Sequence, residues 1–328
     1  MTDYDLVGIG NALVDVLASV EDAFVEAHGL DKGAMTLVDD RRSSAIYDDM
    51  PLGQEVSGGS CSNTMAGFAS LTGKGAFIGK VGDDQLGKVF RHEMQALGVD
   101  FTTAAASDGL GTGSCLVLIT PDAQRTMCTN LGAASNLTAA DIAEDVIQSA
   151  KVVYMEGYLF DPPDAQVAFV EAAKMAHASG RKVSITLSDP FCVDRHRDAF
   201  QMFVAGHTDI LFGNEEEIKS LYQVDSFDAA MERVRGHCEI ACLTRGNKGS
   251  VILSAEEVYV IEPLPLNRVV DTTGAGDQYA AGFLYAFTQG MELKRCGQIA
   301  TLAATEVIGH VGGRPETSLR ELVKRELA

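Results

Sequence analysis

The chain has 328 residues, of which 46% are hydrophobic, so it can bury a sizeable core without disulfides or a structural metal. Its 46 acidic side chains outnumber 26 basic ones and give a formal net charge of -20. This charge argues against nucleic acid as a partner, because proteins that bind a phosphate backbone present a basic face.

Short apolar runs alternate with amphipathic helical patterns along the chain. The runs predict strands at 4–10, 76–82, 151–157, 182–188, 209–214, 239–246 and 250–255, and helical patterns occupy 83–97, 163–178, 215–221 and 227–236. Parallel strands need crossover connections, so this order predicts an α/β fold with a mostly parallel sheet and helices on both faces. Ligands in such folds bind beyond the C-terminal ends of the strands.

Two segments, 12–55 and 100–131, interrupt this alternation. The second contains two predicted strands, GSCLVLIT and RTMCTN, joined by the turn PDAQ. We expect both segments to form a small β-rich lid over the strand ends, within a single domain that spans 1–328. Closure of a lid excludes water during a transfer reaction.

The sequence GIGNALVD follows the first predicted strand. Asn11 and Asp15 lie where the chain leaves the core for the predicted lid, and the Asp15 carboxylate could accept hydrogen bonds from two vicinal hydroxyls. The alternative is a solvated turn. The segment lacks the third glycine and the helix-start spacing of a dinucleotide fingerprint, which disfavours a Rossmann dehydrogenase.

The sequence SGGSCSN precedes a helical pattern. Gly58 and Gly59 permit close backbone approach of a ligand or serve as a hinge of the lid, while Ser60, Ser62 and Asn63 offer hydrogen bonds at the start of the helix. Taken alone, the segment is equally consistent with an ordinary helix N-cap.

Two further segments carry weaker signals. In NEEE, one helical turn places Asn214 and Glu217 on one face, where a hydrated hard cation can be held, although a solvated acidic turn has the same pattern. The sequence TRGNKGS joins two predicted strands through Thr244, Gly246 and Gly249, as many hairpins do.

The strongest signal is DTTGAGD, which precedes a helical pattern. Gly274, Ala275 and Gly276 predict a small turn that presents free N–H groups at a helix N-terminus, where they can hold an anion such as a transferring phosphoryl group. Asp277 lies at the start of the same helix, where its ionised form is favoured and can accept a proton. A structural cap and turn is the alternative.

DTTGAGD followed by Gly282 resembles the second signature of the ribokinase (PfkB) family of carbohydrate kinases, and SGGSCSNTMAGFASLTG resembles the first. The resemblance covers nearly the whole chain and implies a three-layer α/β/α sandwich with a small β-rich lid. It implies an ATP-dependent kinase that uses Mg²⁺, with Asp277 as the base and the 274–276 turn as the anion hole.

The resemblance also implies roles for other positions. It assigns the substrate's hydroxyls to Asn11, Asp15, Gly58, Gly59 and Asn63, ATP to Asn214, Thr244, Gly246 and Gly249, and an indirect Mg²⁺ role to Glu217. A K⁺ site beside Asp271 and Thr273 is conceivable by the same analogy. Arg125, in the predicted lid, could contact a polyanion or be a surface cation.

Several segments resemble the adenosine kinase branch of the family: GIGNALVD, NLGAASNL, LSDPF and FGNEEE. A nucleoside needs an apolar or aromatic slot for its base, for which the candidates are Tyr158, Leu159, Phe160, Leu37 and Leu131; Leu159 departs from the adjacent aromatics of that branch. We therefore expect phosphorylation of the 5'-hydroxyl of adenosine or a related nucleoside. The alternatives are a kinase of free sugars such as ribose or fructose, and a non-catalytic nucleoside or sugar sensor.

The seven cysteines lie in apolar segments without a CxxC pair, and Cys238 and Cys242 have no second pair nearby to complete a metal site. The N-terminal sequence is not a signal peptide, and no apolar run approaches the ~20 residues of a membrane span. We expect a cytoplasmic protein without membrane partners, either a monomer or a homodimer.

Overall fold

The computed structural model describes residues 3–122, 124–266 and 268–327. These residues form a main sheet of nine strands in the order β14-β13-β12-β11-β10-β9-β1-β5-β6. The strands are β1 (Tyr4–Ile9), β5 (Gly75–Ile78), β6 (Val99–Asp100), β9 (Ala150–Glu156), β10 (Lys182–Thr186), β11 (Ile210–Asn214), β12 (Ile240–Thr244), β13 (Ser250–Ser254) and β14 (Val258–Ile261). Pairing is parallel from β6 to β12 and antiparallel between β12, β13 and β14. The predicted α/β class with a mostly parallel sheet is confirmed.

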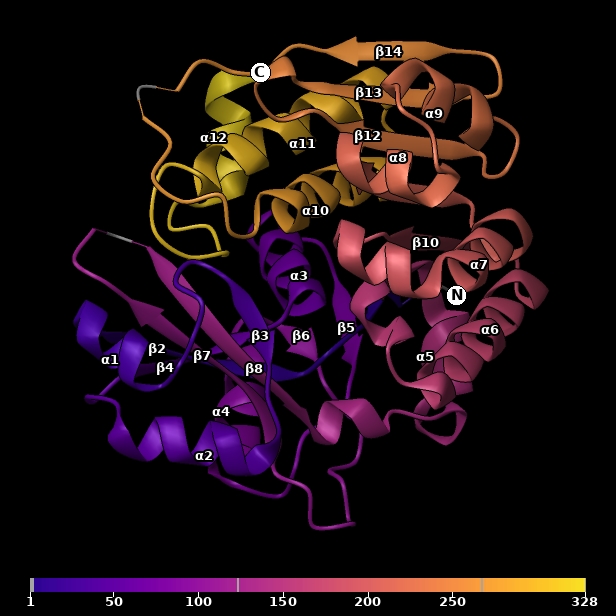
Figure 1. The fold of residues 1–328 in the computed structure, drawn as a ribbon. Helices are drawn as coiled ribbons and strands as arrows, with labels where there is room; N and C mark the ends of the chain where they lie inside the picture. The colour runs from indigo at the N-terminus through magenta and orange to yellow at the C-terminus, as the bar shows by residue number, and fades with distance from the viewer. Residues whose placement is uncertain (1–2, 123, 267, 328) are drawn as a thin grey trace.

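Helices cover both faces of this sheet, as Figure 1 shows. On one face lie α5 (Glu144–Ser149), α6 (Pro163–Ala178), α7 (Pro190–His207), α8 (Glu215–Tyr222) and α9 (Phe227–Val234). On the other lie α3 (Ser60–Ser70), α4 (Gln85–Ala96), α10 (Ala275–Thr288), α11 (Leu293–Val307) and α12 (Leu319–Glu326). Short 3₁₀ turns complete the described secondary structure: η1 (Ala133–Asn136), η2 (Ala139–Asp141), η3 (Gly157–Phe160) and η4 (Gly246–Lys248).

The two core layers follow from the alternation of side chains along each strand. In β9, Val153 and Met155 pack under α6 and α7, whereas Val152 and Tyr154 pack on the side of α3 and α10. The side chains on both faces of β9 are buried, which explains why this strand is a continuous apolar run rather than an alternating one.

A second, smaller sheet lies beside the main one, at the lower left of Figure 1. Its order is β3-β8-β7-β2-β4, and its elements are β2 (Leu13–Ser19), β3 (Met35–Leu37), β4 (Gln54–Gly58), β7 (Thr112–Ile119) and β8 (Arg125–Gly132), with α1 (Asp22–Ala27) and α2 (Asp40–Asp49) packed on it. We call it the small sheet. Its strands come from the two segments that interrupt the βα alternation, and β7 and β8 form the predicted hairpin.

The two faces of the small sheet differ in composition. One face packs Val16, Leu116 and Cys128 against α1 and α2. The opposite face carries a row of paired residues across four strands, because Asp15 pairs with Cys115, Cys115 with Thr129, and Thr129 with Leu37. Leu37 is 49% exposed at the end of this row.

Two further features concern the cysteines and the length of the helices. All seven cysteines are free thiols, and six of them are buried. Within the described ranges, no helix is long and apolar enough to cross a membrane.

Candidate active site

Polar residues gather at the C-terminal ends of the parallel strands of the main sheet. Asn11 follows β1, Glu156 ends β9, and Asn214 and Thr244 end β11 and β12. Asn214 and Thr244 are direct neighbours in the strand pairing. Because parallel strands end at the same edge, these residues lie along one rim of the sheet. The small sheet begins at β2, two residues after Asn11.

The N-terminus of α10 reaches this rim through the glycine-rich turn. Glycine is required at position 274 for two reasons: its φ is 75°, and a Cβ there would overlap the backbone of Gly313. The N–H of Ala275 donates to the Thr272 carbonyl over 3.2 Å. In the described chain, the N–H groups of Gly276 and Asp277 have no such partner. They are the donors of the turn that are open to an anion.

Asp277 lies in the first turn of α10, where this helix packs on α3. Its Oδ1 accepts a hydrogen bond from Ser60 Oγ at 2.6 Å, and its Oδ2 accepts one from Asn63 Nδ2 at 3.3 Å. Burial raises the pKa of Asp277 to about 6, the two hydrogen bonds act against this shift, and the charge of Asp15 adds to it. At neutral pH the carboxylate is therefore ionised in most molecules and can accept a proton.

Two glycines bring the start of α3 against the start of the small sheet. A Cβ on Gly58 would overlap the Asp15 carboxylate, and a Cβ on Gly59, which has a φ of 93°, would overlap the Asn11 carbonyl. Burial raises the pKa of Asp15 to about 6, while the positive charges of Arg314 and Arg125 act against this shift. The structure thus brings Asn11, Asp15, Gly58, Gly59, Asn63 and Asp277 together.

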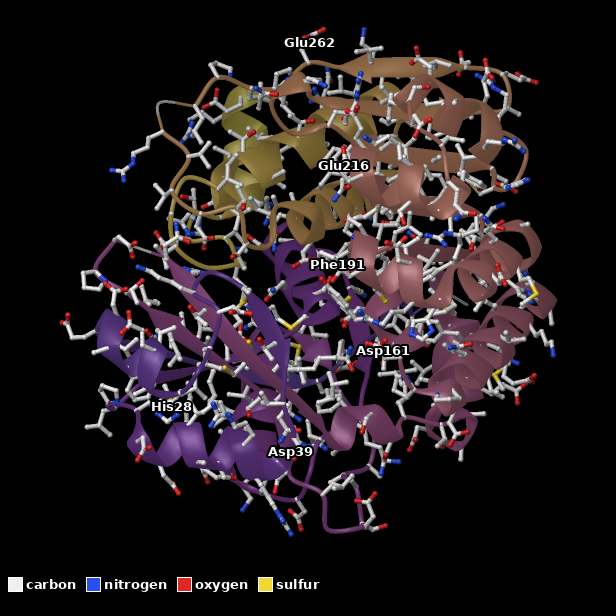
Figure 2. The ribbon with its side chains drawn as sticks, in the orientation of Figure 1. His28, Asp39, Asp161, Phe191, Glu216 and Glu262 are labelled. Carbon is white, nitrogen blue, oxygen red and sulfur yellow. The ribbon has the colours of Figure 1, made fainter. Side chains whose placement is uncertain are left out.

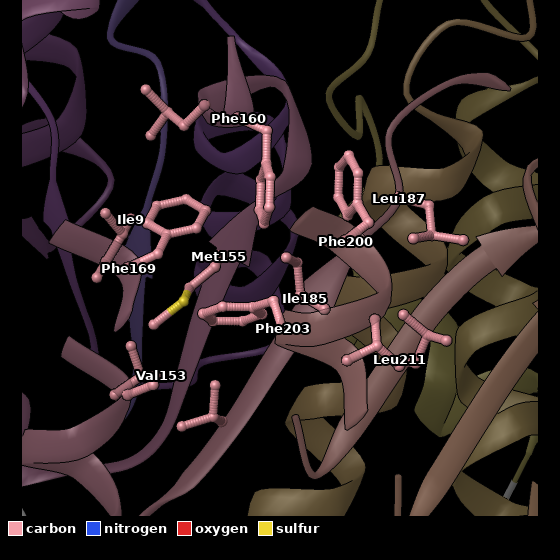
Figure 3. Close-up of a cluster of buried hydrophobic side chains, with 14 of the residues drawn as sticks. Ile9, Val153, Met155, Phe160, Phe169, Ile185, Leu187, Phe200, Phe203 and Leu211 are labelled. Atoms are coloured by element: carbon pink, nitrogen blue, oxygen red, sulfur yellow. The ribbon is translucent and has the colours of Figure 1, made fainter. Parts of the chain in front are cut away.

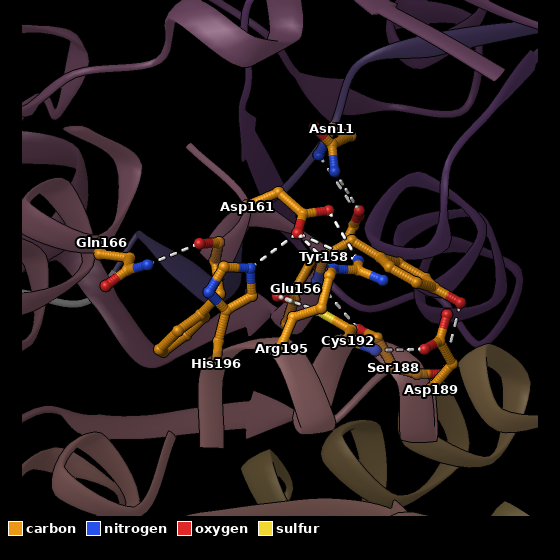
Figure 4. A network of polar contacts seen from close by, with 12 residues as sticks. Asn11, Glu156, Tyr158, Asp161, Gln166, Ser188, Asp189, Cys192, Arg195 and His196 are labelled. Carbon is orange, nitrogen blue, oxygen red and sulfur yellow. Dashed lines mark hydrogen bonds and ion pairs between the residues drawn. The ribbon is translucent and has the colours of Figure 1, made fainter. Parts of the chain in front are cut away.

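Glu156 is a buried carboxylate that the sequence analysis did not select. It is 1% exposed, and it accepts hydrogen bonds from Asn11 Nδ2 at 2.7 Å and from the backbone N–H of Cys61 at 2.8 Å. Figure 4 shows the pair of contacts between Asn11 and Glu156. Burial raises the pKa of Glu156 to about 7, and the charge of Asp277 adds to this effect against the hydrogen bonds. The sequence contains a signal that could have identified Glu156, because VVYMEG places a carboxylate at the end of an otherwise apolar strand.

Asn214 and Glu217 form a capping box at the start of α8. Glu217 Oε2 accepts from the Asn214 N–H at 2.9 Å, and Asn214 Oδ1 accepts from the Glu217 N–H at 2.9 Å. Glu217 is 6% exposed. Burial raises its pKa to about 7, and the charges of Asp189 and Asp277 add to the shift against the hydrogen bond from Asn214. Glu217 therefore lies within electrostatic range of Asp277.

Within the described residues, no group of three or more His, Cys, Asp or Glu side chains is arranged to hold a metal ion. A Mg²⁺ ion bound to phosphates keeps several waters and needs only one or two protein carboxylates. Glu217 suits that kind of indirect contact, because it is a single ionisable carboxylate beside the rim rather than a member of a closed cage.

Thr244, Gly246 and Gly249 lie in the tight connection between β12 and β13. Gly246 has a φ of 56° and Gly249 a φ of 80°, and a Cβ on Gly249 would overlap the Ile261 carbonyl. The adjoining Arg245 holds Glu215 of α8 through a 3.0 Å contact. This connection is thereby attached to the acidic turn that contains Glu217.

Asp271 and Thr273 lie in the loop that precedes α10. The Asp271 carboxylate contacts Arg125 of β8 at 2.8 Å and accepts hydrogen bonds from the Gly312 N–H at 2.8 Å and from Thr273 Oγ1 at 2.8 Å. Burial acts to raise the pKa of Asp271, but these hydrogen bonds and the Arg125 charge outweigh it and leave the pKa below its usual value. Arg125 is not a surface cation, because it is mostly buried and joins the small sheet to this loop.

The structure changes the set of residues that we expect to bind the base of a nucleoside. Tyr158 is partly buried, and its backbone N–H donates to Ser188 Oγ at 3.1 Å, as Figure 4 shows. Leu159 and Phe160, by contrast, are 0% and 2% exposed. Phe160 stacks on Phe200 inside the core shown in Figure 3, with ring centroids 4.0 Å apart. The prediction that Leu159 and Phe160 face a ligand is therefore wrong, because the η3 turn directs both into the core.

Two aromatic side chains remain near the rim. Tyr158 follows the end of β9, and Phe191 lies in the first turn of α7, after Asp189, the residue that caps this helix. Phe191 is 74% exposed, and Figure 2 labels it on the side of α7 that is turned toward α10.

Residues 47–319 match the model of the pfkB family carbohydrate kinases. Adenosine kinase of Saccharomyces cerevisiae is 29% identical over 330 residues, which cover 94% of this chain and 95% of the yeast protein.

Solved structures match over nearly the full length. Adenosine kinase from Sinorhizobium meliloti is 45% identical, with a TM-score of 0.91 and coverage of 98% of this chain and 99% of that one. A probable sugar kinase protein from Rhizobium etli is 44% identical, with a TM-score of 0.92 and 99% coverage of both chains. Adenosine kinase from Schistosoma mansoni, solved with 2-fluoroadenosine, is 23% identical with a TM-score of 0.84, a likeness of fold.

Proposed function

Since the chain belongs to the pfkB family of carbohydrate kinases, we propose that it transfers the γ-phosphate of ATP to the 5'-hydroxyl of adenosine or a related nucleoside. Membership makes the protein a phosphotransferase with an alcohol group as acceptor and implies the use of ATP. The nucleoside is the proposed part. The phosphoryl-transfer chemistry is supported by the ionisable Asp277 beside free N–H groups. The choice of a nucleoside is supported by 45% identity to the Sinorhizobium meliloti adenosine kinase.

In this proposal Asp277 accepts the proton of the attacking hydroxyl. The free N–H groups of Gly276 and Asp277, and the partial positive charge of the α10 N-terminus, hold the transferring phosphoryl group in the anion hole of residues 274–276. Phosphoryl transfer has a loose transition state with little covalent chemistry for the protein to perform. Most of the acceleration then comes from alignment of the hydroxyl with the phosphate and from charge stabilisation.

Asp15 and Asn11 would fix the sugar. The Asp15 carboxylate has no hydrogen-bond donor within the described chain and faces the backbone at Gly58, so it is available to two neighbouring hydroxyls. Gly58, Gly59 and Asn63 would contribute polar groups from the start of α3, where both glycines allow a close approach. Such contacts orient the substrate rather than react with it.

ATP would lie toward β11 and β12, against Asn214, Thr244, Gly246 and Gly249. Mg²⁺ would neutralise charge on the β- and γ-phosphates, with Glu217 acting on its water shell. The proposed K⁺ site beside Asp271 and Thr273 rests on family analogy. The Asp271 carboxylate already accepts from four donors, so a cation there would depend on backbone carbonyls of the loop.

The base of the nucleoside would lie between the small sheet and the start of α7. Leu37 and Cys115 lie in the same strand-paired row as Asp15, so an apolar surface adjoins the proposed sugar ligand. Leu131 is partly exposed at the end of β8, and Tyr158 and Phe191 supply aromatic rings. In this arrangement the small sheet acts as a lid that covers the reacting groups and excludes water.

A kinase of free sugars is the second candidate, since the Rhizobium etli probable sugar kinase protein is as similar in sequence and fold as the Sinorhizobium meliloti enzyme. Both candidates use the same groups around Asp277 and differ in the apolar row. A sensor without turnover has no need of an aligned base and anion turn, and nothing in the site favours it.

A substrate panel decides between these functions. The purified protein is incubated with ATP and Mg²⁺ and, in turn, adenosine, inosine, guanosine, ribose or fructose, and ADP release is measured. We expect turnover on at least one nucleoside at micromolar to millimolar concentrations. Activity only on free sugars would replace the nucleoside proposal with the second candidate, and binding without ADP release would identify a sensor.

A further inference from the structure

Arg314, in the loop after α11, reaches both the start of α3 and the base of the small sheet. Its Nε lies 3.2 Å from Asn63 Oδ1, one terminal nitrogen lies 3.2 Å from Ser62 Oγ, and the other lies 3.4 Å from Glu93 Oε2. The side chain is 23% exposed. The three nitrogens of one guanidinium therefore contact two elements of the site, α3 through Ser62 and Asn63 and α4 through Glu93.

The contact with Asn63 determines which way the Asn63 amide faces. A guanidinium only donates hydrogen bonds, so it selects the amide oxygen and leaves the NH₂ group on the other side. That NH₂ group donates to Asp277 Oδ2 at 3.3 Å. In the reversed orientation, the amide NH₂ would face the guanidinium and the amide oxygen would face the Asp277 carboxylate, which gives two repulsive contacts in place of two attractive ones.

The backbone on both sides of this contact is held by the residue that follows Asp277. Gln278 Nε2 lies 2.8 Å from the Asn63 carbonyl and 2.9 Å from the Gly313 carbonyl. Gly313 also has no room for a Cβ, which would lie 2.7 Å from Asn63 Nδ2. The segment that carries Arg314 is thus fixed against Asn63 and against the first turn of α10.

Glu93 connects the same guanidinium to the strand that leads into Gly58. Glu93 Oε2 accepts from the Ser57 N–H at 2.7 Å, and Ser57 is the next-to-last residue of β4. Arg314 therefore contacts, through Glu93, the point where the small sheet joins α3. Its positive charge also acts against the raised pKa of Asp15.

We propose that Arg314 is a positioning residue for phosphoryl transfer: it fixes the Asn63 amide so that its NH₂ group, and not its oxygen, faces Asp277. The inference rests on the proposed function, in which Asp277 is the base. Arg314 contacts Ser62, Asn63 and Glu93 rather than Asp277, so its effect on Asp277 is carried by Asn63. A purely structural role, in which Arg314 only ties the loop to α3, makes different predictions.

The test compares Arg314→Lys with Arg325→Lys, an exposed arginine whose Nε contacts Glu326. Lysine keeps the positive charge but has no planar guanidinium to contact Asn63, Ser62 and Glu93 at the same time. We expect Arg314→Lys to lower kcat/KM about tenfold or more, since small misalignments are costly, and Arg325→Lys to leave it unchanged. The acidic limb of the kcat/KM profile should also move to higher pH, because the hydrogen bond from Asn63 lowers the pKa of Asp277.

Asn63→Ala provides the second variant, because it removes the amide through which Arg314 acts. We expect Arg314→Lys to add less than a twofold loss in the Asn63→Ala background, since the two residues work as one unit. An equal loss in both backgrounds would overturn the proposal. So would an unmoved acidic limb accompanied only by a lower midpoint of thermal unfolding, which is the result of a structural role.

Asp277→Asn distinguishes a failure of the proposed function from a failure of the proposed role of Arg314. Near-normal turnover of Asp277→Asn overturns the proposed function. A severe loss for Asp277→Asn, with an unmoved acidic limb in Arg314→Lys, leaves the function in place and overturns only the role of Arg314.

Discussion

Arg125 of strand β8 contacts the carboxylate of Asp271, in the loop that leads into α10, at 2.8 Å. The side chains are only 15% and 11% exposed. This pair joins the small sheet to the glycine-rich turn, so movement of the sheet away from the rim would separate two buried charges.

The first prediction concerns this pair. Arg125→Met leaves Asp271 without its cation in a mostly buried site and should destabilise the protein by about 3 kcal/mol, whereas the double variant with Asp271→Asn should cost less than the sum of the single changes. Urea unfolding of the four proteins measures the coupling. The exposed pair Lys324–Glu321 is the matched control, for which we expect little or no coupling because solvent screens both charges. Additive effects at Arg125 and Asp271 would show that the contact carries no energy.

The second prediction concerns Asp277. Asp277→Asn keeps the size of the side chain and one acceptor oxygen but removes the carboxylate that accepts the proton, so kcat should fall by about 10²- to 10⁴-fold with nucleoside binding largely intact. Steady-state kinetics and a direct binding measurement check both parts. Asp164→Asn, an exposed acid in the first turn of α6, should have wild-type kinetics.

The third prediction concerns the acidic turn. Glu217→Gln should raise the Mg²⁺ concentration for half-maximal rate by about 10- to 100-fold, as loss of an outer-shell group typically does. The control is Glu216→Gln in the same turn, whose side chain is 68% exposed and pairs with Lys219. An identical Mg²⁺ dependence in both variants would exclude a metal-linked role for Glu217.

The fourth prediction concerns the apolar row of the small sheet. Leu37→Ser removes apolar surface beside the proposed base site and should raise the nucleoside KM about tenfold, with kcat little changed. Leu52→Ser, in a fully exposed loop, should leave KM unchanged. A wild-type KM for Leu37→Ser would show that the base lies elsewhere.

The fifth prediction is a dependence of stability on pH. The pKa of Glu156 is about 7 in the folded protein, where burial raises it, and close to its ordinary value of 4.5 in the unfolded chain. Between these values the folded chain holds a proton that the unfolded chain has released, so raising the pH favours unfolding. The contribution of Glu156 is fully present below pH 4.5 and is lost as the pH rises through 7.

The comparison with Glu156→Gln isolates this effect, because glutamine does not titrate. The stability of the wild type relative to Glu156→Gln should decline by on the order of 3 kcal/mol between pH 4.5 and pH 8. Urea unfolding across this range measures it. A constant difference would mean that Glu156 keeps the same charge in both states.

Local patterns predicted much of the fold. Each long apolar run became a strand, and the β7–β8 hairpin was visible from its turn residues, because strand length and turn chemistry depend on neighbours in the sequence. The GAG segment likewise lies at the start of a helix, with Gly274 as the N-cap and Ala275 as the first residue of α10. The two edge strands β6 and β14 were missed, since they are short and partly exposed.

The missed parts of the site depend on contacts between distant segments. Glu156 and Asn11 are 145 residues apart in the chain, and Arg314 and Asn63 are 251 apart. No sequence pattern near Arg314 predicts its contact with Asn63. The prediction for Leu159 and Phe160 was wrong for a local reason, because one 3₁₀ turn decides which of three consecutive side chains faces the core.

The place of β1 in the sheet has a consequence for folding during synthesis. The first strand of the chain lies in the interior of the main sheet, between β5 and β9. One of its edges therefore has no partner until residues 150–156 have left the ribosome. An unpaired apolar strand is prone to aggregation. The nascent chain therefore passes through a stage in which holdase chaperones can bind this strand. Folding from denaturant should also be slow, because β1 and β9 are distant in the sequence.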